Sequence, residues 1–263
     1  MSDDNQMLTF GGHLEVLRRM SFRVLIVTAV LAVAIFCFKD TTFALLLAPS
    51  KSDFCLYRWI EQFFAWVGYD FHFAPFEVDL IATDLSSQFM THISTSFYLG
   101  LLCASPYILF ELFRFISPAL YENERKYSIP VLLTIYTLFV VGVLMSYYIL
   151  FPISFRFLGT YSVAEQVHST ITLDSYISTF VMLTLVMGVV FQLPVIAYFL
   201  AKLGFIDSEM LAKYRQYAFL IIMIVAAIIT PPDLMTLVLV TIPLYLLYEI
   251  SIIVIRKVKS KNE

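Results

Sequence analysis

One uncharged run limits most strongly what this chain can fold into. Between Lys126 and Arg156 there is no acidic or basic residue, and most of the side chains are apolar. A helix needs about 20 such residues to cross a hydrocarbon core about 30 Å thick. Hydrophobic residues make up 60% of the chain, above the roughly 45–50% apolar content of soluble domains. The pattern predicts an integral membrane protein.

Similar apolar runs recur along the chain. We expect an all-α integral membrane protein with six transmembrane helices, arranged as a single polytopic domain over residues 1–263. The expected spans are about 22–45, 86–110, 128–152, 175–202, 216–230 and 234–255, and an outer loop covers about 46–85.

The last two spans are expected to be short. Thr230-Pro231-Pro232 ends the fifth helix, because proline lacks a backbone donor and clashes with the preceding turn. The remaining stretch, Tyr217–Ile229, gives about 20 Å of helix at about 1.5 Å per residue, less than the hydrocarbon thickness. The sixth run starts at Leu234 and reaches Glu249 after fifteen residues. We expect a tight hairpin that thins the bilayer locally.

Positive charge is distributed unequally between the two sides of these spans. Thirteen of the seventeen Lys and Arg residues fall on one side. Cytoplasmic segments of short-looped membrane proteins carry such an excess, so both termini are expected in the cytoplasm. A basic inner face matches anionic lipid, so membrane lipid rather than nucleic acid is the expected charged partner. The thirteen are Arg18, Arg19, Arg23, Arg114, Arg125, Lys126, Lys202, Lys213, Arg215, Arg256, Lys257, Lys259 and Lys261.

The expected outer loop is rich in aromatic residues. Ten Phe, Tyr or Trp residues, including both tryptophans of the chain, lie within Phe54–Phe76. Such rings favour the headgroup level of a bilayer. The pattern favours an amphipathic cap on the outer leaflet, with a substrate-facing lid as the alternative. Cys55 lies in this loop and could pair with Cys37, but three structural cysteines, with Cys103 as the third, are the simpler interpretation.

The sequence carries no recognisable catalytic motif. Its four histidines are scattered without an HExxH pair, and it contains neither a GxSxG nor a P-loop sequence. We therefore expect no enzyme, no cofactor and no metal.

Strongly polar side chains at membrane depth are functional candidates, because burying them there costs free energy. Gln192 lies in the fourth span, Asp233 at the start of the sixth and Glu249 near its inner end. Asp233 suits helix capping, and Gln192 suits either a helix–helix hydrogen bond or a site. A proton- or ion-coupled small-solute transporter, the alternative function, would need a chain of titratable groups across the membrane. The spans hold no such chain.

Two cytoplasmic segments combine carboxylates with arginines. One reads His13-Leu14-Glu15-Val16-Leu17-Arg18-Arg19, and the other runs from Phe115 to Arg125. A solvated or self-paired charge cluster would explain either segment alone.

The second segment resembles the first cytoplasmic loop signature of the TatC family, the multispanning signal receptor of the twin-arginine protein translocase. Its matching residues are Phe115-x-x-Pro118-x-Leu120-Tyr121-x-x-Glu124-Arg125. The N-terminal segment is similar to the family's HLxELR motif, and Thr230-Pro231-Pro232-Asp233 with Pro243…Glu249 is similar to its last hairpin. The resemblance implies a concave TatC-like bundle.

The resemblance also implies a non-enzymatic receptor in the bacterial cytoplasmic (inner) membrane. Members of this family bind the paired arginines of signal peptides on folded cargo at the cytoplasmic face. They assemble with single-span TatA/TatB-type subunits in a multimeric complex, and the proton motive force drives transport.

Binding roles follow from the same resemblance. A guanidinium group pairs with a carboxylate through two parallel hydrogen bonds, whereas lysine offers a point charge. We expect Glu124 to take one arginine, with Glu15 or Glu122 as the second carboxylate. Phe115, Pro118, Leu120 and Tyr121 would shape the loop, and His13, Arg18, Arg19 and Arg125 would orient the carboxylates. Gln192, Asp233 and Glu249 are the expected intramembrane polar or partner contacts.

The chain departs from the family pattern in places. The motif glutamate falls on Val16, and Glu15 stands one residue earlier, about 100° away around a helix. Met20 occupies a position where the family often has a second arginine. Gln192 replaces a frequent glutamate, which keeps hydrogen bonding but removes the charge. The first outer loop is also longer than usual.

Overall fold

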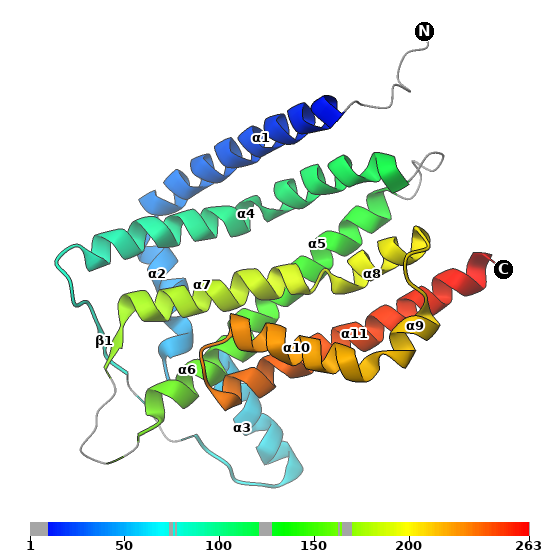
Figure 1. Ribbon diagram of the computed structural model, residues 1–263. Coiled ribbons are helices and arrows are strands. Elements are labelled where there is room, and N and C mark those ends of the chain that lie inside the picture. Colours follow the sequence, from blue (N-terminus) through cyan, green and yellow to red (C-terminus); the bar gives the residue numbers. More distant parts are fainter. Residues whose placement is uncertain are drawn as a thin grey trace. The chain divides into compact units, whose positions relative to one another are not determined.

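The computed structural model describes residues 10–73, 76, 78–120, 128–162, 164 and 170–262 (Figure 1). Among these, helices predominate, and the expectation of an all-α protein is confirmed. Two strands of two residues each, β1 (Leu80–Ile81) and β2 (Ile171–Thr172), pair in parallel. The helices are α1 (Phe10–Cys37), α2 (Lys39–Leu47), η1 (Ala48–Ser50), α3 (Cys55–Val67), α4 (Ser87–Leu120), α5 (Ser128–Met145), the π-helix η3 (Ser146–Leu150), α6 (Phe151–Thr160), α7 (Leu173–Val190), α8 (Leu193–Lys202), α9 (Ser208–Lys213), α10 (Arg215–Ile229) and α11 (Leu234–Asn262).

Five helical segments in the described part are long and apolar enough to cross a membrane. The helix α10, at fifteen residues, is shorter, so the count of six spans and their orientation stay predictions. The five segments are Leu14–Cys37, Ser87–Phe115, Ile129–Thr160, Leu173–Lys202 and Leu234–Lys257.

The chain divides into two compact units. The first consists of Met1–Phe38 and Ser96–Tyr136, and the second of Lys39–Thr95 and Thr137–Glu263. The expectation of a single polytopic domain stays a prediction. The two units are described separately below.

In the first unit, α1 runs alongside α4 (Figure 1). A side-chain carbon at Gly100 would lie only 2.8 Å from the backbone nitrogen of Ala32, so the two helices approach as closely as glycine allows. Further along, Arg23 reaches Glu111. From one contact to the other, the residue number increases along α1 and decreases along α4, so the two helices are antiparallel. This brings the N-terminal motif beside the end of α4.

In the second unit, an aromatic cluster forms the core. The ring of Phe151 lies 5.0 Å from those of Tyr176 and Phe180, and Phe155 lies 4.9 Å from Tyr176. These edge-to-face contacts join α6 to α7. The buried hydroxyl of Tyr176 donates to the carbonyl of Leu46 over 2.7 Å, which attaches α2 to the same core.

Three helices break or change within the expected spans. The first ends at Cys37 inside the expected segment 22–45, and α2 begins at the charged pair Lys39-Asp40. In the third span, η3 precedes Pro152, which has no N–H for the preceding turn. In the fourth, a turn at Phe191-Gln192 separates α7 from α8, just before Pro194. Proline therefore shapes two of the three breaks.

The expectation of a short sixth helix is wrong. The helix α11 has 29 residues and continues through Glu249. Its carboxylate forms a two-pronged ion pair with Arg215 of α10, with both N–O distances at 2.8 Å, and accepts a hydrogen bond from Tyr245. Glutamate is a good helix former, so the helix continues through this position, and the ion pair joins α11 to α10.

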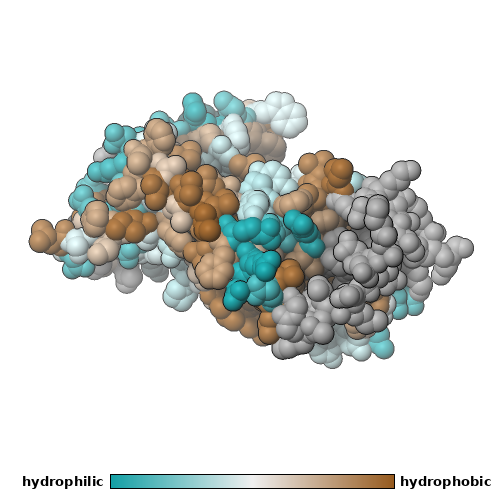
Figure 2. All heavy atoms as spheres, turned by 90° about the horizontal axis from the view of Figure 1, so that it is seen from above, coloured by the Kyte–Doolittle hydropathy of each residue, from teal (hydrophilic) through white to brown (hydrophobic). Residues whose placement is uncertain are grey.

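Hydrophobic side chains cover much of the surface that Figure 2 shows. Along α1, apolar residues such as Ile26, Val30 and Val33 are largely exposed. A soluble monomer rarely exposes large apolar patches, whereas a bilayer covers them. The exposed surface therefore agrees with a membrane-spanning protein.

Candidate functional site

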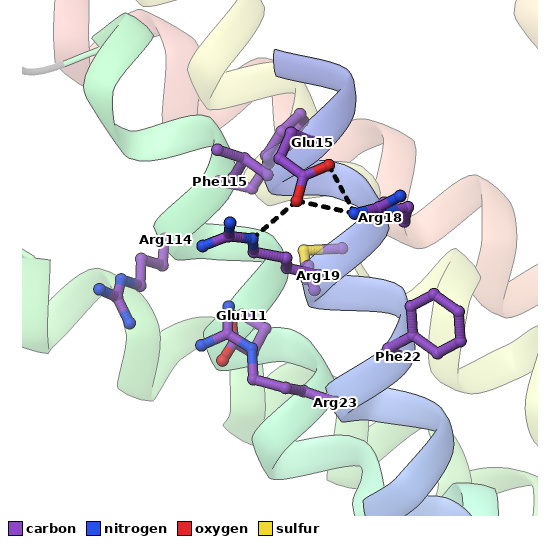
Figure 3. A pocket seen from close by; sticks show the side chains of 10 residues that line it. Glu15, Arg18, Arg19, Phe22, Arg23, Glu111, Arg114 and Phe115 are labelled. Carbon is purple, nitrogen blue, oxygen red and sulfur yellow. Dashed lines mark hydrogen bonds and ion pairs between the residues drawn. The ribbon is translucent and has the colours of Figure 1, made fainter. Parts of the chain in front are cut away.

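A pocket of about 710 Å³ lies in the first unit between α1 and α4 (Figure 3). It combines charged with apolar side chains and is large enough for a pair of extended side chains. Its lining residues are Glu15, Val16, Arg18, Arg19, Met20, Phe22, Arg23, Glu111, Arg114 and Phe115.

Glu15 projects from α1 and pairs with the two arginines that follow it. One carboxylate oxygen lies 2.9 Å from Arg18 Nη2 and the other 2.8 Å from Arg19 Nε. The spacings of three and four residues place all three groups on one side of the helix. Both guanidinium groups are largely exposed. The ion pairs are therefore solvated and contribute little to stability.

Glu111 forms a second, different network at the base of the pocket. Its side chain is only 4% exposed, and one oxygen lies 3.3 Å from Arg23 Nη2. The other accepts a hydrogen bond of 2.9 Å from Tyr107 of the same helix. Removing either partner would leave a buried carboxylate poorly compensated. Glu111 is thus fixed in place, whereas Glu15 is free to exchange its partners.

The remaining charged and aromatic groups of the pocket come from the end of α4. Arg114 is exposed and Phe115 half-buried, and the spacing of Phe115 from Glu111 puts these two on one helix face. Among the residues that line the pocket, four arginines face two glutamates. A cationic ligand would therefore need to displace a resident arginine or meet further carboxylates.

The predicted signal-binding and orienting residues fall into three groups. Glu15, Arg18, Arg19 and Phe115 are brought together in the pocket. His13, Pro118 and Leu120 belong to helices whose side chains there are not described. The other predicted residues, Tyr121, Glu122, Glu124 and Arg125, lie outside the part of the chain that the structure describes. The α4 helix itself continues to Leu120, so the expected loop signature begins on a helix.

The three intramembrane candidates lie in the second unit. Gln192 is buried in the turn between α7 and α8. Asp233 caps α11, since its carboxylate accepts a hydrogen bond of 2.7 Å from the backbone N–H of Thr236. Glu249 is held by Arg215. Their role as partner contacts stays a prediction.

Sequence reasoning missed Glu111, Arg23 and Tyr107. In the sequence, Arg23 counts only among the thirteen basic residues, and Glu111 simply follows the second expected span. The spacing of four residues between Tyr107, Glu111 and Phe115 was the available signal, because it marks one face of a helix. The pairing with Arg23 depends on the register of α1 against α4, which the sequence alone does not reveal.

Comparison with known proteins identifies relatives of this chain. The family model described as Sec-independent protein translocase protein (TatC) matches residues 12–243. The TatC protein of Blattabacterium sp. subsp. Periplaneta americana is 32% identical over 100% of both chains. TatCy of Bacillus subtilis is 38% identical over 71% of this chain and 74% of its own. A crystal structure of the twin-arginine translocase receptor TatC matches with a TM-score of 0.73 and 33% identity, covering 93% of this chain and 98% of that one. The matched residues include both carboxylates of the pocket.

Proposed function

Because this chain belongs to the TatC family of Sec-independent protein translocases, we propose that it is the signal receptor of a twin-arginine translocase. The family is one of protein-transport components, and the chain is a membrane protein of that pathway. In the proposed role it catalyses no reaction. It binds the Arg-Arg signal peptides of folded cargo at the cytoplasmic face of the bacterial inner membrane.

The observation that carries this proposal is the partly exposed carboxylate of Glu15 in a pocket with Phe115 (Figure 3). Its present partners, Arg18 and Arg19, each contact it through a single guanidinium nitrogen. An incoming signal arginine can offer two parallel N–H groups to the same carboxylate, a stronger and more specific pairing than these single-nitrogen contacts. Glu15 thereby becomes an exchangeable arginine site.

In this chain the glutamate stands one residue before the position of the family's motif glutamate, and the pocket accommodates this shift. Both Glu15 and Val16 line the pocket. A carboxylate one residue earlier on α1 therefore still reaches the same space. Glu15 replaces the family glutamate in this proposal.

The carboxylate that joins Glu15 in this proposal belongs to the segment after α4. That helix carries the pocket-lining Phe115 and ends five residues later, at Leu120. We assign the first signal arginine to Glu124, with Glu122 as its neighbour. Four resident arginines repel any cation that lacks a carboxylate partner, so the pocket needs this additional negative charge.

The proposed receptor works with other subunits. Single-span TatA/TatB-type proteins join it in a multimeric complex, and the proton motive force drives transport. Buried Gln192, together with Asp233 at the tip of the α10–α11 hairpin, offers polar groups for contacts within the membrane. Glu249 supports such contacts by holding α10 against α11.

Binding of a labelled Arg-Arg signal peptide to the detergent-purified chain tests the proposal. A Lys-Lys peptide and the Glu124→Ala variant are each expected to lose about 1.5–3 kcal/mol, the value of a hydrogen bond to a charged group. Asp207→Asn is the matched control, because this exposed carboxylate makes no capping hydrogen bond. It should bind like the unaltered chain.

Two results would contradict the proposal. Equal binding of both peptides would mean that apolar contacts alone hold the signal. Uptake of a small solute by vesicles that contain only this chain would support the transporter instead.

A further inference from the structure

The helix α3 has two unlike faces, and one of them packs inside the second unit. With 13 residues it is about 20 Å long, too short to cross a bilayer. Leu56 and Tyr57 are buried on the packed side. The hydroxyl of Tyr57 donates to the carbonyl of Pro152 over 2.9 Å, and burial raises the pKa of Tyr57 to about 12. This phenol therefore remains a hydrogen-bond donor at any physiological pH.

Further contacts fix α3 to α6. The guanidinium carbon of Arg156 lies 4.4 Å from the ring centre of Phe73, 4.8 Å from Phe76 and 5.0 Å from Tyr57. Such cation–π contacts are attractive, because the face of an aromatic ring carries partial negative charge. Glu61 accepts a hydrogen bond from the backbone N–H of Phe73. Tyr57 and Glu61 thus hold α3 in the second unit, and Gly68, with a positive φ of 91°, ends the helix.

The opposite face of α3 carries a stripe of exposed rings. Trp59 is 57% exposed, Phe63 60% and Trp66 84%. Their spacing of four and three residues aligns them along one side of the helix. We call these three residues the aromatic stripe.

The aromatic stripe continues the apolar surface of a membrane span. The ring of Trp59 lies 6.2 Å from that of Tyr148, which belongs to the segment Ile129–Thr160. Ile149 and Phe157 of that segment are also exposed. A bilayer that covers these side chains therefore extends to the aromatic stripe. Tryptophan, with an apolar body and one N–H group, suits the boundary between headgroups and acyl chains.

The net charge around α3 shows whether it would contact a bilayer by inserting its rings or by attraction to anionic lipid. Two basic residues, Lys51 and Arg58, and three acidic residues, Asp53, Glu61 and Asp70, lie along or beside α3. A net negative balance does not attract anionic lipid. Contact with the bilayer must come from the rings themselves.

We propose that α3 lies in the lipid–water interface, with Trp59, Phe63 and Trp66 inserted among the headgroups and the upper acyl chains. This contact anchors the end of the span formed by α5 and α6. It does not depend on the signal-binding role proposed above.

Tryptophan fluorescence tests this proposal directly, because both tryptophans of the chain lie in the aromatic stripe. The full chain, carrying either Trp59→Phe or Trp66→Phe, is reconstituted in nanodiscs of zwitterionic lipid. Bromine placed high on the acyl chains is expected to quench most of the emission of each single-tryptophan variant. Bromine near the bilayer centre should quench less, and aqueous acrylamide least. Anionic lipid should leave these results unchanged.

A charged residue within the stripe provides the matched comparison. Phe63→Asp should expose Trp66 to acrylamide and reduce its quenching by bromolipid. Ala65→Asp adds the same charge to another side of α3 and should leave the quenching unchanged. Efficient acrylamide quenching without bromolipid quenching in the unaltered stripe would overturn the proposal. So would protection that arises only after single-span partner proteins are added, because a protein would then be the occupant.

Discussion

At the scale of single residues, the two carboxylates of the pocket differ in how firmly they are held. Glu15 is paired with two exposed arginines, whereas Glu111 is buried between Arg23 and Tyr107. A group with solvated partners can exchange them for a ligand, and a buried group cannot do so without large cost. This contrast separates the proposed binding residue from the structural one.

The first prediction concerns Glu15. Replacing it by Gln is expected to weaken Arg-Arg peptide binding about tenfold or more, the effect of losing one charge-assisted hydrogen bond. The double variant Glu15→Val with Val16→Glu should regain most of the affinity, because both positions line the pocket. Peptide titration measures both. A swap that binds no better than Glu15→Gln would show that the carboxylate position on α1 is strict.

The second prediction concerns the network around Glu111. Arg23→Gln leaves a buried carboxylate without its cation, and with Arg23 itself 48% exposed the expected loss of stability is about 1–3 kcal/mol. Adding Glu111→Gln should recover part of this loss, because the buried charge disappears. Thermal unfolding in detergent measures the difference. A double variant less stable than Arg23→Gln would contradict the assignment.

The sequence predicted part of this site and not the rest. Glu15, Arg18, Arg19 and Phe115 were identified because they fall in contiguous motifs. Glu111 escaped notice because its partner Arg23 is 88 positions away, and their contact depends on how α1 docks on α4.

At the scale of helices, close approach and inter-helix ion pairs determine which elements pack together. The contact of α1 with α4 at Gly100 brings backbone against backbone. The ion pair of Glu249 with Arg215 joins α11 to α10. Both effects are tertiary, so the hydropathy pattern predicted the apolar segments but not the length of α11 or the break after Cys37.

The third prediction follows from the helix contact. Gly100→Ala places a carbon 2.8 Å from the Ala32 nitrogen, and a backbone atom cannot rotate away. Overpacking of this kind costs about 1–3 kcal/mol, and the melting temperature should fall. Helix propensity alone predicts a gain of about 0.5–1 kcal/mol from the same change. A higher melting temperature would therefore show that α1 does not approach α4 this closely.

The fourth prediction tests the α10–α11 hairpin. Arg215→Lys keeps the positive charge but loses the fork that grips both oxygens of Glu249. We expect a loss of about 1 kcal/mol or less, since both groups are partly exposed. Arg215→Gln should cost more than Arg215→Lys. If Arg215→Lys were as stable as the unaltered chain, the two-pronged geometry would contribute nothing.

At the scale of the whole molecule, topology decides whether the pocket faces the compartment where cargo is made. The excess of basic residues predicts both termini in the cytoplasm. The count of six depends on α10, whose fifteen residues give about 22 Å of helix. A crossing helix this short requires local thinning of the bilayer.

The fifth prediction is that α10 and α11 both cross. In a background without Cys37, Cys55 and Cys103, single cysteines at Asp207 and Lys261 should react with an impermeant thiol reagent from the same side. A cysteine at Lys51 should react from the other side. Labelling of positions 207 and 261 from opposite sides would mean that α10 does not span the membrane.

The most direct test of the receptor proposal is a double-mutant cycle between signal and pocket. One signal arginine is changed to Gln, Glu124 is changed to Gln, and peptide binding is measured for each change and for both together. A paired arginine and carboxylate should show a coupling energy of about 1–3 kcal/mol, and a second cycle should couple the other arginine to Glu15. For each pair of one signal arginine and one carboxylate, the loss of binding free energy in the double change is compared with the sum of the two single losses. If the two are equal for every pairing with Glu124, Glu15 and Glu122, then these carboxylates do not bind the signal arginines.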